Sequence, residues 1–176
     1  MPALLDHIDP NGLEEFSVVF TDRSLNHMSK EFQQVMCDLS SNLKEVYNAN
    51  AVVLVPGGGT FAMEAVARQF GVDASVLVVR NGWFSYRWSQ IFEASANARA
   101  TTVVKARMVG NEAVAPFRPA DVDDVVEKIK EEKPNIVFAP HVETSAGVIL
   151  PDHYVKKIST AAHAVSYTHL RAHETG

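Results

Sequence analysis

Three successive glycines followed by a threonine form the clearest chemical feature of this sequence. The stretch Pro56-Gly57-Gly58-Gly59-Thr60 lies between an apolar run and an amphipathic segment, which predicts a strand, a tight turn and a helix. Glycines let the backbone approach a ligand closely, and the first N–H groups of a helix bind anions. This stretch is therefore a candidate phosphate site, and the alternative is a tight turn that binds nothing.

The same glycines also fit the G-x-G-x-x-A pattern of dinucleotide-binding proteins, through Gly57, Gly59 and Ala62. That pattern expects an acidic residue after the next strand, where this chain has Arg80. Because an arginine suits a 2'-phosphate, an NADP-binding oxidoreductase domain stays open as an alternative. It would place the glycine turn near the start of its domain, whereas a whole predicted helix precedes the turn here. A non-catalytic binding module of the same fold is a second alternative.

Aromatic side chains crowd the segment after the predicted strand at residues 75–80. Trp83, Phe84 and Trp88 lie at the carboxyl end of that strand, where ligands gather in open α/β sheets. One of these rings would stack on a flat heteroaromatic ligand. The alternative is that each ring belongs to the core of the helix that follows.

A third polar segment follows the predicted strand at residues 136–139. His141, Glu143, Thr144 and Ser145 bring imidazole, carboxyl and hydroxyl groups to this segment. Since the carboxyl ends of parallel strands share one edge of a sheet, we expect these groups to meet the glycine turn and the aromatic loop. Capping of a helix by Thr144 or Ser145 explains part of the pattern but not the convergence of three segments.

The elements that position these loops alternate between two hydrophobic periods. The predicted strands cover residues 51–55, 75–80, 101–106 and 136–139. The predicted helices cover residues 29–48 with Ser29 as N-cap, 60–70, 85–96, 121–132 and 152–164. A long connection runs through Gly110 and Pro116. This alternation predicts an α/β fold with a mostly parallel sheet between helices.

Composition narrows the function classes. The 176 residues are 47% hydrophobic and carry a formal charge of -5, so the chain has enough apolar residues for one globular core and no basic surface for nucleic acid. A small-molecule partner is favoured. The single cysteine, Cys37, offers no disulfide framework. No apolar run reaches membrane-span length and the N-terminus lacks a signal-peptide pattern, so we expect a cytoplasmic protein.

Taken together, the three segments resemble those of the class V, fold-type I aminotransferases, the group of the alanine-glyoxylate and serine-pyruvate aminotransferases. Residues 57–64 are similar to the family's phosphate turn, residues 81–87 to its ring-stacking loop, and residues 141–147 to its H-x-E-[ST]-[ST]-x-G segment. The resemblance covers about residues 21–164. It implies the N-terminal part of the family's large cofactor-binding domain, with the sheet incomplete in this chain.

The resemblance implies pyridoxal 5'-phosphate (PLP) as the cofactor and no metal ion. The residues that it assigns to PLP are Gly58, Gly59, Thr60, Phe84 and Thr144. The first three would bind the phosphate, Phe84 would stack on the pyridine ring, and Thr144 would lie near the ring oxygen. Many relatives have Trp at the position of Phe84, and here Trp83 stands one residue earlier, so either ring is a candidate for stacking.

The implied reaction transfers an amino group between a small amino acid, of the alanine or serine type, and a 2-oxo acid such as glyoxylate or pyruvate. In the family a later lysine forms a Schiff base with PLP, an Asp pairs with the pyridine nitrogen and an Arg binds the substrate carboxylate. None has a counterpart after Val165. We therefore assign no catalytic residue, expect this chain itself to be inactive, and expect a homodimer for the full-length parent. A desulfurase-like or lyase activity stays open within the PLP enzymes.

Three segments are expected along the chain: an N-terminal arm at residues 1–28, a partial PLP-binding large domain at 29–165, and a tail at 166–176. The tail lacks the apolar run of a further strand, and we expect it to be non-native. His169 and His173 stand four apart within it, but we expect no metal site there. Asn26 and His27 are similar to the family's active-site entrance and receive no role.

Overall fold

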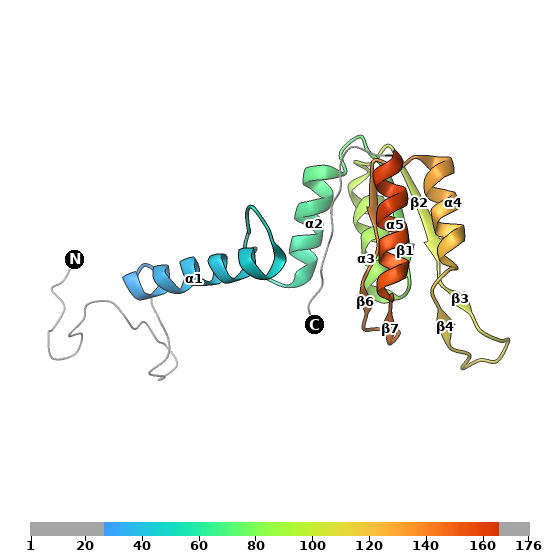
Figure 1. Ribbon diagram of the computed structural model, residues 1–176, viewed down its shortest axis with the longest axis horizontal. Helices are drawn as coiled ribbons and strands as arrows, with labels where there is room; N and C mark the ends of the chain where they lie inside the picture. Colours follow the sequence, from blue (N-terminus) through green and yellow to red (C-terminus); the bar gives the residue numbers. More distant parts are fainter. Residues whose placement is uncertain (1–26, 166–176) are drawn as a thin grey trace, which may run out of the picture. The chain divides into compact units, whose positions relative to one another are not determined.

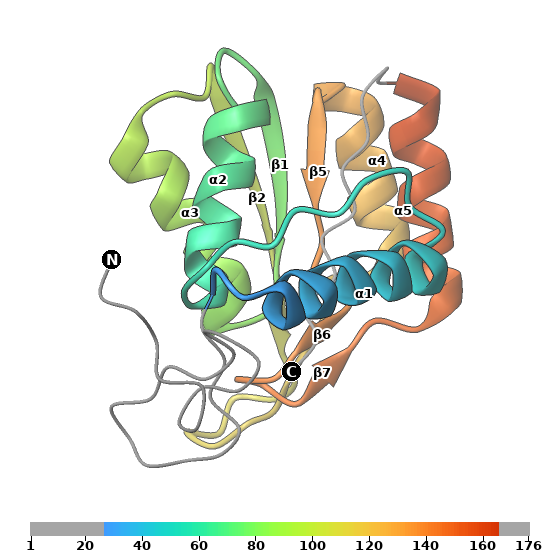
Figure 2. The ribbon, with the colours of Figure 1, turned by 90° about the vertical axis from the view of Figure 1, so that its left-hand side faces the viewer.

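The computed structural model describes residues 27–165 and is drawn in Figures 1 and 2. The chain divides between Val55 and Pro56 into two compact units. The predicted tail, most of the predicted arm, and the residues Asn26, His169 and His173 lie outside the described part, so the predictions made for them stay predictions.

The described part of the first unit is helix α1 (Lys30–Tyr47) and the segment that follows it. The helix begins and ends where the sequence predicts. The Ser29 hydroxyl accepts the backbone N–H of Phe32 at 3.1 Å, as an N-cap does. Asn48 ends the helix in the left-handed conformation, with φ of 47°.

The predicted strand at residues 51–55 is wrong, because these residues form no strand and pair with no strand of the described chain. Val53 is 82% exposed, and Leu54 and Val55 are also exposed. A short apolar run predicts a strand only where a neighbouring strand pairs with its backbone and a core covers its side chains. Neither condition holds here, although the glycine turn still follows this run directly.

The second unit is the α/β structure expected from the sequence. Its helices are α2 (Gly59–Phe70), α3 (Trp83–Ser95), α4 (Val122–Glu132) and α5 (Asp152–Val165). Its main strands are β1 (Ser75–Arg80), β2 (Ala100–Lys105) and β5 (Ile136–Phe138). They form a three-stranded parallel sheet in the order β2-β1-β5. Because all three strands run in the same direction, their carboxyl ends lie at one edge of the sheet.

Helices cover both faces of this sheet, as the sequence predicts (Figure 2). Val76 and Val78 of β1 lie in one hydrophobic cluster with residues of α2 and α3. Leu77 and Val79 of the same strand lie in a second cluster with residues of α4 and α5. All four side chains are almost fully buried. A strand buried on both faces reads as a continuous apolar run, which is why β1 was predicted at its observed bounds.

Two small hairpins were not predicted. Strands β3 (Arg107–Met108) and β4 (Phe117–Arg118) pair antiparallel within the long connection after β2. Strands β6 (Val142–Glu143) and β7 (Val148–Ile149) pair antiparallel after β5, so the third polar segment is a hairpin. Strands of two residues are too short to give an alternating pattern in the sequence.

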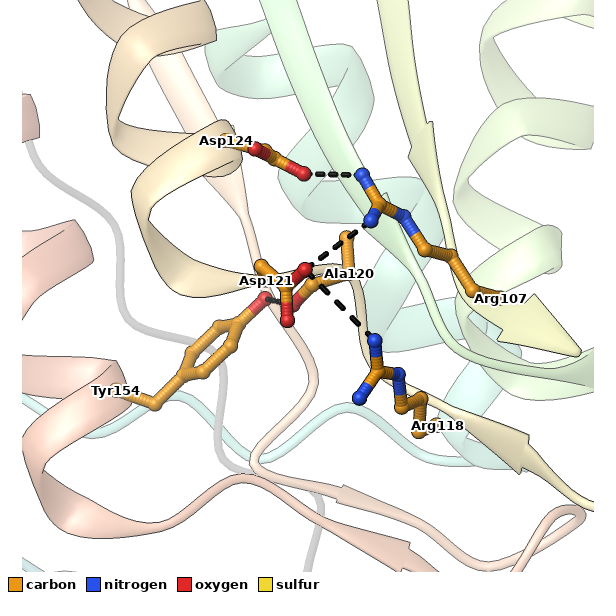
Figure 3. A network of polar contacts seen from close by, with 6 residues as sticks. All are labelled: Arg107, Arg118, Ala120, Asp121, Asp124 and Tyr154. Atoms are coloured by element: carbon orange, nitrogen blue, oxygen red, sulfur yellow. Dashed lines mark hydrogen bonds and ion pairs between the residues drawn. The ribbon is translucent and has the colours of Figure 1, made fainter. Parts of the chain in front are cut away.

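Charged side chains tie the β3–β4 hairpin to the start of α4 (Figure 3). Arg107 forms ion pairs with Asp121, at 3.1 Å, and with Asp124. Arg118 lies 3.9 Å from Asp121. About half of each side chain is exposed, so water screens these pairs and each contributes little to stability.

Tyr154 links α5 to the same region. Its hydroxyl donates a hydrogen bond to the carbonyl oxygen of Ala120 at 2.8 Å (Figure 3). Burial raises the pKa of Tyr154 to about 12, and the negative charges of Asp121 and Asp124 add to that effect. The tyrosine is therefore held in its neutral form.

Candidate functional site

The three segments singled out in the sequence meet at the carboxyl edge of the sheet. Helix α2 begins at this edge, and Arg87 of α3 donates a hydrogen bond from Nη1 to the Thr60 hydroxyl oxygen at 2.9 Å. Hairpin β6–β7 meets the start of α3 through Glu143 and Ser145. Helix α3 thus contacts both of the other segments, and the predicted convergence of the three segments is confirmed.

The glycine turn leaves the start of α2 open. Gly58 is the N-cap, and no side chain caps the helix. A methyl group added at Gly58 or Gly59 would meet nothing within 4 Å, so there is open space beside both residues. Gly57 differs from them, with φ of 127° and the Phe61 ring so close that an added carbon would lie 2.1 Å from it. Gly57 therefore shapes the turn.

Helix α3 is capped from a distance by a carboxylate. Glu143 is 1% exposed and accepts hydrogen bonds from the backbone N–H groups of Phe84, at 3.0 Å, and Ser85, at 2.8 Å. It also accepts the hydroxyl groups of Ser85, at 2.5 Å, and Ser145. Ser145 in turn accepts the N–H of Trp83 at 2.8 Å. The first turn of α3 and the β6–β7 hairpin are therefore held as one unit.

The environment of Glu143 favours its ionised form. Burial alone would raise the pKa of this carboxyl group, but the hydrogen bonds from Ser145, Ser85 and Phe84 outweigh burial and lower it. The positive end of the α3 dipole acts in the same direction. The carboxylate therefore occupies the anion-binding end of α3.

The three aromatic residues have three different environments. Trp88 is a core residue, 5% exposed and stacked on Phe138 with ring centroids 4.3 Å apart. Trp83 is 57% exposed, and its ring centroid lies 5.8 Å from that of Tyr86. Phe84 is 40% exposed. Core packing thus explains Trp88 but not Trp83 or Phe84.

Arg80, which the dinucleotide alternative needs for a 2'-phosphate, also contacts Tyr86. Its guanidinium carbon lies 5.0 Å from the centroid of the Tyr86 ring. Its side chain therefore packs on an aromatic face at the end of β1.

Thr144 is an exposed residue of the turn between β6 and β7. It lies between Glu143 and Ser145, which both bond to the first turn of α3. Its own carbonyl oxygen accepts the N–H of Gly147 at 3.4 Å. The alternative that Thr144 or Ser145 caps a helix of this segment is wrong, because the segment is a hairpin and Ser145 binds the start of α3.

Two further polar residues at this edge were given no role from the sequence. Asn81 is 3% exposed, and neither its amide nitrogen nor its carbonyl oxygen has a hydrogen-bond partner among the described residues. The buried Nε of Arg87 also has none there. A polar residue directly after a buried strand is the signal that could have identified Asn81.

The sequence model of the aminotransferase class-V family matches residues 13–170. The chain belongs to the class V aminotransferases. This match extends beyond the range expected from the sequence motifs at both ends. The α/β fold with its parallel sheet between helices is likewise that of a solved relative.

Among the described residues, no helix is long and apolar enough to cross a membrane, and no three His, Cys, Asp or Glu side chains gather where a metal ion would bind.

This aminotransferase chain matches only part of the length of each of its named relatives. The soluble hydrogenase small subunit of Synechococcus sp. (strain PCC 6716) is 31% identical over 127 residues, which are 71% of this chain and 31% of that protein. The alanine–glyoxylate aminotransferase of Rattus norvegicus is 29% identical over 132 residues, 73% of this chain and 30% of that protein. This chain thus spans about a third of the length of these curated relatives.

A solved structure matches this chain over a similar share of its length. The crystal structure of ureidoglycine-glyoxylate aminotransferase from Bacillus subtilis superposes with a TM-score of 0.60 at 22% identity, over 78% of this chain and 34% of that one. At 22% identity this superposition shows that the two chains share a fold and no more. The substrates in the name of the Bacillus subtilis enzyme are said of that enzyme alone.

Proposed function

We propose that the whole protein is a PLP-dependent transaminase, and that this chain supplies its phosphate turn, stacking ring and ring-oxygen contact. The observation that carries the proposal is the uncapped start of α2, with open space beside Gly58 and Gly59 and the Thr60 hydroxyl next to them. Free N–H groups at a helix start bind phosphate well. Membership of the class V aminotransferases makes PLP the phosphate compound to expect.

Comparison of two helix starts supports α2 as the phosphate site. Both α2 and α3 begin at the carboxyl edge of the sheet, and each has a positive end. The Glu143 carboxylate already binds the N–H groups at the start of α3, and a phosphate there would be repelled by it. The start of α2 has no such carboxylate cap. An anionic ligand therefore binds preferentially at α2.

Helix geometry favours Phe84 over Trp83 as the stacking ring. Side chains three or four residues apart share one side of a helix. Phe84 lies three residues before Arg87, which bonds to α2, and four before Trp88, which faces the sheet. Phe84 thus shares a side of α3 with both residues, whereas Trp83 has this spacing to Arg87 but not to Trp88. Trp83 packs against Tyr86 instead.

The residues of this chain fit the chemistry of PLP. Two free backbone N–H groups and a hydroxyl group suit the phosphate, an aromatic ring suits the pyridine, and the buried carboxamide of Asn81, directly after β1, has polar atoms without a partner among the described residues. When bound, PLP supplies the electron sink for amino-group transfer. The role of the chain is to bind and orient: Thr60 holds the phosphate, Phe84 fixes the ring plane and Thr144 lies near the ring oxygen.

The proposal also covers the substrates, the cellular location and the oligomeric state of the whole protein. The substrates are a small amino acid of the alanine or serine type and a 2-oxo acid such as glyoxylate or pyruvate; alanine and glyoxylate are the pair in the rat relative's name. The whole protein is cytoplasmic and a homodimer. The lysine that carries PLP in the family falls in a later stretch, so we expect the isolated 176-residue chain to be inactive.

No second function is supported by a site of its own. The NADP alternative gives no role to Glu143 or Thr144, and Arg80 packs on Tyr86. The Synechococcus relative is named as a hydrogenase subunit, and that name points to no second group of residues in the described part of this chain. A non-catalytic binding module would use the same phosphate turn, and an activity assay distinguishes it.

The test is an activity assay of the whole protein, purified with and without added PLP. Alanine and serine serve as amino donors, and glyoxylate and pyruvate as acceptors, with formation of the new amino acid measured by chromatography. We expect PLP-dependent amino transfer for at least one pair. Tight PLP binding without transfer for any pair would favour the non-catalytic module, and failure to bind PLP would end the proposal.

A further inference from the structure

Arg87 makes a contact that the phosphate site as described does not explain. It is half-buried on α3, and its Nη1 donates to the Thr60 hydroxyl oxygen at 2.9 Å, across the boundary between two helices. No carboxylate of the described residues forms an ion pair with it, and its buried Nε has no hydrogen-bond partner among them. A partly buried cation without a counter-ion is costly, so the site favours a bound anion.

The contact also decides what the Thr60 hydroxyl can do. A hydroxyl group has one hydrogen to donate and two lone pairs that accept. Because Thr60 accepts from Arg87, one lone pair is used and its hydrogen stays available for donation to another group. Thr60 is the second residue of α2, beside the uncapped helix start. Its hydrogen can therefore be donated to an anion at that start.

We propose that Arg87 is a positioning residue for the phosphate site: its guanidinium group holds the Thr60 hydroxyl as a donor and adds a positive charge that favours a phosphomonoester dianion at the start of α2. This rests on the proposed PLP site. The ligand contacts of Arg87 are made through Thr60, so its effect is confined to ligands that carry the phosphate.

The test compares PLP with pyridoxal, which has the same ring and no phosphate. Dissociation constants of both are measured with the whole protein by equilibrium titration, for the unmodified protein and for Arg87→Met. Arg68→Met is the matched control, because Arg68 lies at the other end of α2, exposed and paired with Glu64. Circular dichroism verifies that each variant is folded.

We expect Arg87→Met to raise the dissociation constant of PLP about ten- to a hundredfold, the range of one hydrogen bond to a charged group. The constant for pyridoxal should change less than about twofold, and Arg68→Met should change neither. An equal loss for PLP and pyridoxal, or no loss for either, would overturn the role of Arg87. If the unmodified protein binds neither compound, the proposed PLP site itself fails.

A second variant keeps the test decisive if Arg87→Met does not fold. Thr60→Val removes the hydroxyl group and leaves the arginine in place. We expect it to weaken PLP selectively over pyridoxal, and we expect the two substitutions together to cost less than the product of their separate effects. Fully independent effects would show that Arg87 does not act through Thr60.

Discussion

The Glu143 carboxylate binds both the backbone N–H and the hydroxyl group of Ser85, at 2.8 and 2.5 Å, although 58 residues separate them in the sequence. This pairing fixes the first turn of α3 against the β6–β7 hairpin. The proposed stacking ring, Phe84, and the proposed ring-oxygen contact, Thr144, are neighbours of these two residues in the chain. Their relative position therefore depends on one buried carboxylate.

Substitution of Glu143 by Gln should destabilise the fold by about 2 kcal/mol, because the amide nitrogen would face donors and leave them without an acceptor. Chemical denaturation measures the change. Glu93→Gln is the control, since Glu93 is an exposed residue of α3, the helix that Glu143 caps, and its substitution should change stability by less than about 0.5 kcal/mol. Equal stability of the two variants would contradict the role given to Glu143.

The same residue predicts a dependence on acid. Because the folded-state pKa of Glu143 lies below its ordinary value of 4.5, its stabilising effect is present above pH 4.5 and is lost as pH falls through the folded pKa. The loss of stability in this acidic range should be smaller in Glu143→Gln than in Glu93→Gln. Identical pH profiles of the two variants would refute this.

Gly82 is predicted to be intolerant of a side chain for reasons of space. A carbon added there would lie 2.6 Å from the Ser145 hydroxyl oxygen and 2.7 Å from Cγ of Glu143, although its extended φ of 177° suits any residue. Gly82→Ala should therefore cost about 1 to 3 kcal/mol of unfolding free energy. Gly59→Ala, in open space within a helix, should stabilise the fold by up to about 1 kcal/mol while weakening PLP binding. The opposite order of stability would count against this packing.

Tyr154 predicts a loss of stability in alkali. Its folded-state pKa of about 12 lies above the unfolded value near 10, so its contribution is complete below about pH 10 and is lost as pH rises toward 12. We expect a loss of up to about 2 kcal/mol over that range, measured by denaturant titration at several pH values. Tyr154→Phe should be less stable at neutral pH, because the Ala120 carbonyl loses its donor, and should lack this alkaline loss. A variant with an unchanged alkaline slope would exclude Tyr154 as its source.

Phe84 and Trp83 should differ in their effect on cofactor binding. Phe84→Ala should raise the dissociation constant of PLP about tenfold, since stacking contributes on the order of 0.5 to 1.5 kcal/mol beyond the area it buries. Trp83→Ala should change it less than about twofold, because the Trp83 ring packs against Tyr86. Titration of the whole protein with PLP distinguishes the two, and a larger effect at Trp83 would exchange their roles.

The spacing of apolar residues along the sequence was enough to predict the three-stranded sheet and the helices that cover it. Strand β1 is buried on both faces, and α1 has its predicted N-cap and its predicted bounds, so each left a clear local pattern. The apolar run at residues 51–55 shows the limit of this reasoning. Such a run does not specify a partner strand, and none of the described strands pairs with it.

The sequence predicted which three segments form the candidate site but not the contacts that join them. Glycines and aromatic residues at strand ends are visible in a single segment. The bonds of Glu143 and Ser145 to α3, and of Arg87 to Thr60, join segments that only the fold brings together. For this reason local helix capping by Thr144 or Ser145 was left open as a partial explanation, whereas Ser145 binds the first turn of α3, a helix from a different part of the chain.

The most direct test of the central proposal is a crystal structure of the whole protein with PLP. We predict that the phosphate lies on the N–H groups of Gly59 and Thr60 at the start of α2, with the pyridine ring against Phe84 and the Thr144 side chain near the ring oxygen. A phosphate bound at another helix start, or a ring stacked on Trp83 away from α2, would contradict the assignment of this site.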